Sequence, residues 1–277
     1  MEHITLDLRA GTFHALASPG DGRPLLFLHG FPDHPPTAES FLTELASRGH
    51  RVVAPWLRGY APSPTRATFE LSTLVDDVLA MIDRLSPHAP VDLVGHDWGA
   101  VLTYFACARA PSRIARAVTL AIPHPLAFLR RLGVPAQLRA SWYMLLFQLP
   151  RAERIAAAND FRLIDRLWQR WSPAFRLTAV QRAELHDTLR ASMPAPIQYY
   201  RAAARATHLV AELRPPIATP LLQLHGADDG CVLPPPRDDR HRFAGAYERN
   251  VIPRAGHFLH LEHPVEIADR ISTWLSA

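Results

Sequence analysis

The sequence contains no lysine, so arginine supplies all 30 of its basic residues. Together with abundant alanine and proline, this composition is typical of a GC-rich bacterial genome. The formal net charge is +4, and residues 124–215 carry 14 arginines against 6 acidic residues. These arginines follow helical spacing and do not form the dense basic stripe with interleaved aromatics that nucleic-acid binding needs. We therefore expect no nucleic-acid partner, although the local positive charge could attract acidic substrates.

Long apolar runs and cysteine-rich patterns are also missing. No run of 18 or more apolar residues is present, so no transmembrane helix is predicted. The first five residues lack the basic flank and apolar stretch of a signal peptide. Cys107 and Cys231 are too few for a disulfide framework and fit no metal-binding spacing. The sequence thus predicts a cytoplasmic protein with no membrane partner, and either a monomer or a homodimer.

Short apolar runs alternate with amphipathic helical patterns along residues 1–123 and 216–277. Predicted strands cover residues 3–8, 12–17, 24–28, 51–55, 91–95, 113–122, 220–225 and 246–252. Predicted helices cover residues 37–48, 71–85, 98–109, 236–243 and 264–276. This alternation is typical of βαβ units and predicts an α/β core with a mostly parallel, eight-stranded sheet flanked by helices.

Residues 124–215 break the alternation and carry only helical patterns. Ser172-Pro173 predicts a helix start, because proline is favoured at the first helical position. Thr178 and Gln181 form a capping-box pattern that opens another helix, and residues 196–208 predict a further one. We interpret 124–215 as an all-helical insertion into the core.

The segment Gly95-His96-Asp97-Trp98-Gly99 joins a predicted strand to a predicted helix. Gly-x-nucleophile-x-Gly at such a turn is the pattern of a nucleophile elbow, which exposes its central residue at the carboxyl edge of a sheet. Here that central residue is a carboxylate. An aspartate after a strand can also be a simple helix N-cap. However, other predicted strand ends also carry reactive groups, in His29-Gly30-Phe31, Asp228-Asp229 and His257.

The order nucleophile, acid, histidine is that of the α/β-hydrolases. With His29-Gly30-Phe31-Pro32 and Gly256-His257-Phe258, the chain resembles the epoxide hydrolase group over nearly its full length. The resemblance implies an α/β-hydrolase fold in which residues 124–215 form a cap over a core of residues 1–123 and 216–277. It implies that Asp97 is the nucleophile and that His257 activates water.

The same resemblance suggests the partners of this pair. The family pattern Gly-x-x-Asp selects Asp229 as the acid that orients His257, with Asp228 as the alternative. The backbone N–H groups of Phe31 and Trp98 are expected to form an oxyanion hole.

The resemblance also implies two proton donors in the helical insertion. The segment 141–148 matches the region that carries the first, Tyr143, and Gln198-Tyr199-Tyr200-Arg201 matches the region that carries the second, Tyr200. A phenol stays protonated at neutral pH because its pKa is close to 10. Tyrosines at helical spacing are also typical of a packed core, which is the competing interpretation. The expected substrate pocket consists of Phe31, Trp98, Trp142 and Phe147.

A carboxylate that attacks an sp³ carbon forms an alkyl ester, which water can hydrolyse, whereas serine would form a stable ether. The sequence therefore predicts an epoxide hydrolase that adds water to a small apolar oxirane to give a vicinal diol. No cofactor and no metal are expected, since His257, His260 and His263 lie in a predicted loop. The alternatives are a haloalkane dehalogenase, a class that generally has asparagine at the position of Phe31, and a non-catalytic small-molecule receptor.

Overall fold

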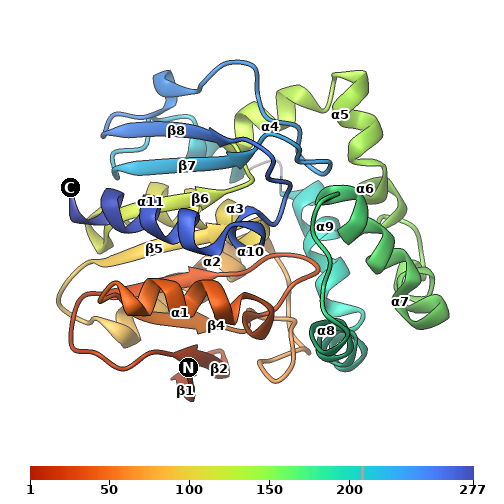
Figure 1. Ribbon diagram of the computed structural model, residues 1–277, viewed down its shortest axis with the longest axis horizontal. Helices are drawn as coiled ribbons and strands as arrows, with labels where there is room; N and C mark the ends of the chain where they lie inside the picture. The colour runs from red at the N-terminus through yellow and green to blue at the C-terminus, as the bar shows by residue number, and fades with distance from the viewer. Residues whose placement is uncertain (207–208) are drawn as a thin grey trace.

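The computed structural model describes residues 1–206 and 209–277, and its centre is an eight-stranded sheet (Figure 1). The strand order is β1-β2-β4-β3-β5-β6-β7-β8, in which β1 and β2 are antiparallel and the others run parallel. The predicted mostly parallel, eight-stranded sheet is confirmed. The strands are β1 (Glu2–Leu8), β2 (Gly11–Ala17), β3 (Pro24–Leu28), β4 (Arg51–Pro55), β5 (Val91–His96), β6 (Ile114–Leu120), β7 (Leu221–Gly226) and β8 (Tyr247–Ile252).

Helices cover both faces of this sheet. Helices α1 (Glu39–Ser47) and α11 (Pro264–Ser276) pack together on one face, and α2 (Leu71–Leu85) and α3 (Trp98–Arg109) pack on the other (Figure 1). Every residue of β3, β5 and β7 is buried. These central strands appear in the sequence as continuous apolar runs because neither of their faces meets water.

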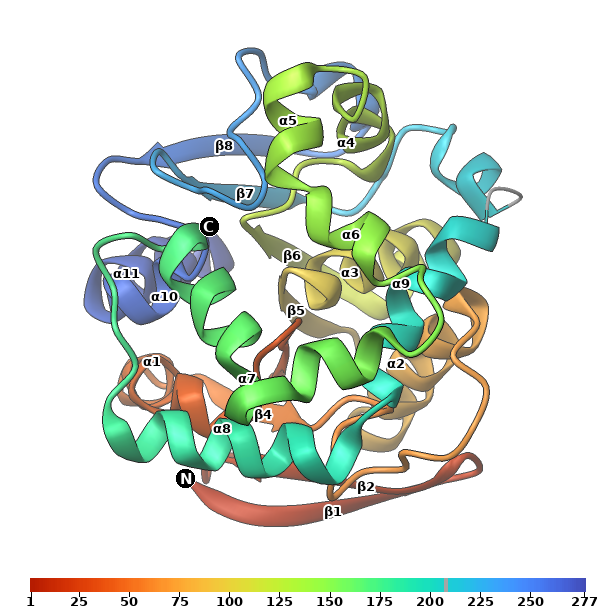
Figure 2. The same cartoon turned by 90° about the vertical axis from the view of Figure 1, so that its right-hand side faces the viewer.

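The helical patterns between β6 and β7 form six helices that lie together beside one end of the sheet (Figures 1 and 2). They are α4 (Pro125–Arg131), α5 (Pro135–Ala140), α6 (Trp142–Leu146), α7 (Ala152–Trp171), α8 (Ala179–Ser192) and α9 (Ala195–Arg205). The predicted capping box is present at the start of α8. The predicted run 196–208 ends at Arg205, and its last two positions lie outside the described residues. Across the described ranges, no helix is both long and apolar enough to cross a bilayer.

Ser172 is not the predicted helix start. Its backbone N–H bonds to the carbonyl of Trp168, which makes it the C-cap residue that follows α7. Its hydroxyl donates to Glu262 at 2.7 Å and accepts the N–H of Phe258 at 2.9 Å. These bonds to a segment about 90 residues away along the chain use the groups that a local cap would need.

Two C-terminal predictions are also wrong. Residues 236–243 form only a short 3₁₀ turn, η4 (Arg240–Arg242). They do not continue as a helix because Ile217 pairs with Phe243 in an isolated bridge and receives the N–H of Ala244. In the segment predicted to be a loop, residues 259–262 form a one-turn helix, α10 (Leu259–Glu262).

Candidate active site

The turn from β5 to α3 holds Asp97 in a strained backbone conformation, with φ 49° and ψ −116°. Residues other than glycine rarely have positive φ. Gly99 lets α3 approach β3 closely, because a Cβ at this position would collide with the carbonyl of Leu28. The Asp97 side chain makes no hydrogen bond that caps α3. The simple N-cap interpretation is therefore wrong, and the carboxylate is free for another role.

Three segments converge on this carboxylate. The N–H of Phe31 donates to Asp97 Oδ1 at 2.7 Å. His257, in the loop after β8, places Nε2 3.5 Å from Asp97 Oδ2. Its Nδ1 lies 2.9 Å from Asp229 Oδ2, so the imidazole stands between two carboxylates. The three predicted triad residues are thus brought together.

The geometry distinguishes the two candidate acids. Asp229 is 2% exposed, and its Oδ1 accepts the backbone N–H groups of Cys231 at 2.7 Å and Val232 at 2.9 Å. Asp228 is exposed to solvent. The backbone N–H groups hold Asp229 in place while its second oxygen faces His257.

The two carboxylates control the protonation of His257. Burial alone would lower the pKa of this imidazole, but the charges and hydrogen bonds of Asp229 and Asp97 outweigh burial and raise the pKa to about 10. An opposite charge within about 4–6 Å favours the charged form of a group. The two carboxylates therefore favour the charged form of the imidazole.

Gly30 allows Asp97 to approach the backbone of the Gly30–Phe31 segment closely. A Cβ at Gly30 would lie 2.8 Å from Asp97 Cγ and closer still to its Cβ. We expect Gly30→Ala to displace the carboxylate and to lower kcat/KM at least about 100-fold, since a misplacement of ~1 Å can have that effect. The matched control is Gly22→Ala, because a Cβ at Gly22 meets nothing within 4 Å. Steady-state kinetics and circular dichroism of both variants test this, and wild-type activity in Gly30→Ala contradicts it.

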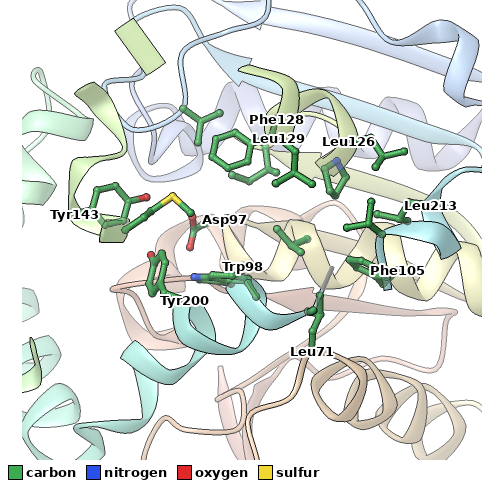
Figure 3. Close-up of a pocket in the computed structure, with 18 residues that line it drawn as sticks. Leu71, Asp97, Trp98, Phe105, Leu126, Phe128, Leu129, Tyr143, Tyr200 and Leu213 are labelled. Carbon is green, nitrogen blue, oxygen red and sulfur yellow. The ribbon is translucent and has the colours of Figure 1, made fainter. Parts of the chain in front are cut away.

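Asp97 shares an apolar cavity with Tyr143 of α6 and Tyr200 of α9 (Figure 3). Both tyrosines are 3% exposed, and their rings meet edge to face at 5.7 Å. Burial raises the pKa of each hydroxyl well above its usual value, which keeps both protonated. The neighbouring Tyr199 instead donates to the carbonyl of Arg58 at 2.6 Å. The helical insertion thus contributes two neutral hydroxyl groups to the cavity of Asp97.

The cavity encloses about 820 Å³ of empty space, its open mouth included. Asp97, Trp98, Tyr143 and Tyr200 are its only polar or amphipathic lining side chains among the described residues. Among the described residues no arginine lines it, so no positive side chain of residues 124–215 contacts the cavity surface there.

Of the four predicted pocket residues, only Trp98 lines the cavity. Trp142 lies at the surface with 37% of its area exposed. Neighbouring helical residues point about 100° apart, so α6 directs Tyr143 inward and Trp142 outward. Phe31 and Phe147 are fully buried behind the cavity, where their rings pack against Tyr200 at 5.3 Å and 5.1 Å. Placing Trp142, Phe31 and Phe147 on the pocket surface was therefore wrong.

A buried polar cluster behind His257 was not predicted. Asp33, His96 and His260 place their ligand atoms within 4.8 Å of one another, the one such group of potential metal ligands in residues 1–206 and 209–277. Burial raises the pKa of Asp33 to about 7 and lowers that of His96 to about 3. His96 Nε2 donates to the carbonyl of His257 at 3.0 Å, which supports the loop that carries the imidazole. No spacing in the sequence links these three positions.

Residues 23–264 match the family model for the alpha/beta hydrolase fold. Epoxide hydrolase 3 of Mus musculus is 31% identical over 290 residues, which cover 96% of this chain and 77% of that protein. The chain belongs to the epoxide hydrolase family.

Other relatives agree with this assignment. Epoxide hydrolase 4 of Homo sapiens is 28% identical, over 95% of this chain and 75% of its own length. A Bacillus megaterium epoxide hydrolase solved with an inhibitor shares the fold with a TM-score of 0.87 at 24% identity, over 99% of this chain and all of that one. An epoxide hydrolase from Vigna radiata gives a TM-score of 0.83 at 23% identity, over 99% and 98% of the two chains. The predicted family and enzyme class are confirmed.

Proposed function

We propose that this member of the family hydrolyses small apolar epoxides to vicinal diols through an ester on Asp97. The observation that carries the proposal is the position of the Asp97 carboxylate. It faces two protonated phenols across an apolar cavity and has an imidazole 3.5 Å away. A nucleophile, proton donors and a base for water therefore meet at one point. In this proposal residues 124–215 act as a cap, because they supply both phenols.

In the first half-reaction one oxygen of Asp97 attacks an oxirane carbon in line with the breaking C–O bond. The carbon–oxygen bond to Asp97 forms as the ring opens, and Tyr143 and Tyr200 donate hydrogen bonds to the departing oxygen. Over this step the alkoxide gains one proton and His257 loses one. A neutral imidazole then stands beside the new ester. Loss of the negative charge on Asp97 favours this change, because that charge helps to raise the pKa of His257.

In the second half-reaction His257 accepts a proton from water, and the resulting hydroxide attacks the ester carbonyl. Asp229 stabilises the imidazolium that forms, as the acid does in a Ser-His-Asp triad. The N–H of Phe31 already contacts Asp97 Oδ1 and is placed to stabilise the oxyanion. The N–H of Trp98 is a second candidate donor, since the first N–H groups of a helix have no partner within it. Collapse of the intermediate releases the diol and restores both Asp97 and the charged His257.

The main alternative is a haloalkane dehalogenase with the same nucleophile. A leaving halide needs N–H donors and no proton, whereas Phe31 has no polar side-chain group and Tyr143 and Tyr200 are suited to protonating an alkoxide. Incubation with styrene oxide and with 1-bromobutane in ¹⁸O-water separates the two. Epoxide hydrolysis yields diol and, on repeated turnover, label in Asp97. Bromide release without any diol would instead establish dehalogenation, and no reaction across an epoxide panel would support the receptor alternative.

We expect Tyr143→Phe and Tyr200→Phe each to lower kcat/KM for styrene oxide roughly 10-fold. The double variant should lose about 10²–10⁴-fold, the range of general acid catalysis. The matched control is Tyr199→Phe, which removes a buried hydroxyl whose hydrogen bond goes to the Arg58 carbonyl. It should lower the melting temperature and leave kcat/KM within a few fold. Full activity in the double variant would show that the phenols are core residues only.

A further inference from the structure

Asp97 lies at one end of its cavity, and the cavity extends from it in a single direction. Figure 3 shows Tyr143, Tyr200 and Asp97 at one end and Leu213, Phe105 and Leu71 at the other. The space between them is lined by α3, α4 and α9. We call this extension of the cavity the arm. One of its lining residues on α4, Leu129, is 46% exposed, so the arm reaches the surface beside α4.

The opposite side of Asp97 is filled by aromatic rings. Phe31, Phe147 and Trp171 are all fully buried, and none of them lines the cavity. We call these three side chains the aromatic wall. The ring centroids of Phe31 and Phe147 lie 5.3 Å apart, and Trp171 packs against Tyr143 at 4.9 Å and against His257 at 5.4 Å. Centroid separations of this size are those of rings in van der Waals contact, so no alkyl chain fits between them.

Because the cavity is open on one side of Asp97 and closed on the other, the direction of attack on the oxirane limits which substituents fit. In-line displacement places the oxirane between Asp97 and the two phenols, so the substituents on its two carbons point sideways in opposite directions. One direction leads into the apolar arm, and the other meets the aromatic wall. A hydrogen atom fits against the wall, whereas an alkyl group would overpack a region that is already dense.

We propose that the protein selects uncharged terminal epoxides, with one apolar substituent in the arm, and that the aromatic wall excludes epoxides substituted on both carbons. This inference rests on the proposed function and names its substrate class. Acidic substituents are also disfavoured, because none of the described residues that line the arm has a cationic side chain. Phe147 is the specificity-determining residue of the wall, since it touches Phe31, Tyr143 and Tyr200 together.

Two isomers of equal size and composition test the inference, 1,2-epoxyoctane and 4,5-epoxyoctane. We expect kcat/KM to favour the terminal isomer roughly 10–200-fold, the discrimination typical of a misfit in an apolar pocket. Phe147→Ala should raise kcat/KM for the internal isomer at least about 10-fold, and Phe147→Leu should do so partially if the alanine variant folds poorly. The control Val180→Ala changes an exposed apolar residue of α8 that does not line the cavity, and it should leave the ratio between the isomers unchanged.

The outcomes separate this inference from the proposed function. Equal kcat/KM for both isomers in the wild-type protein overturns the terminal preference and leaves epoxide hydrolysis intact. An unchanged ratio in both Phe147 variants removes the wall as its cause. If neither isomer gives diol or an ester on Asp97, the proposed function fails and the inference with it.

Discussion

Asparagine in place of Asp97 is expected to lower kcat for epoxide hydrolysis by roughly 10⁴-fold or more, as removal of a catalytic triad member does. The amide keeps an oxygen that can accept the N–H of Phe31, so the local geometry is preserved. Its nitrogen is not nucleophilic, however, and no ester can form. The measurement is kcat on styrene oxide, with intact-protein mass spectrometry to verify that the amide has not hydrolysed to aspartate.

The chain supplies its own control for this substitution. Asp228→Asn makes the same chemical change on an exposed carboxylate outside the site and should leave kcat unchanged. Asp97→Ala provides a variant that cannot revert by hydrolysis. More than about one hundredth of wild-type kcat in either Asp97 variant is incompatible with a triad nucleophile, whose loss has a far larger effect.

His257→Gln is expected to stop the reaction halfway. Ester formation needs Asp97 and a proton donor, and Tyr143 and Tyr200 can supply the proton for one turnover when the imidazole is absent. Ester hydrolysis needs the imidazole to activate water. A single turnover should therefore leave the protein heavier by the mass of one substrate, with the added mass on the peptide that contains Asp97. Multiple turnover should fall by roughly 10⁴-fold.

The control for this variant is His263→Gln, which changes a partly exposed histidine whose ring hydrogen-bonds to the Arg254 carbonyl. It should neither trap an ester nor change kcat. If His257→Gln supports normal multiple turnover, water is activated by another group. If it forms no adduct and no diol, the imidazole is needed before the ester exists.

Much of the fold follows from local patterns. The elbow, the capping box at Thr178 and the alternation of apolar runs with helical patterns depend on residues within a few positions of each other. Such patterns determine backbone conformation directly. The positions of the strands along the chain and the limits of α2 and α3 were therefore predictable. Local patterns failed at Ser172 and at residues 236–243, where distant partners take the hydrogen-bonding groups.

In the candidate site, too, some features follow from local sequence patterns and others depend on tertiary packing. The residue types and their order, with a carboxylate at the elbow and a histidine in the last loop, were evident from sequence patterns. Only the tertiary structure selected Asp229 over Asp228, turned Trp142 outward and placed Phe31 and Phe147 behind the cavity. It also brought Asp33, His96 and His260 together and gave the cavity its single arm. The reason is that side-chain direction and enclosed space depend on how segments roughly 30 to 160 residues apart pack against each other, and no local spacing records that packing.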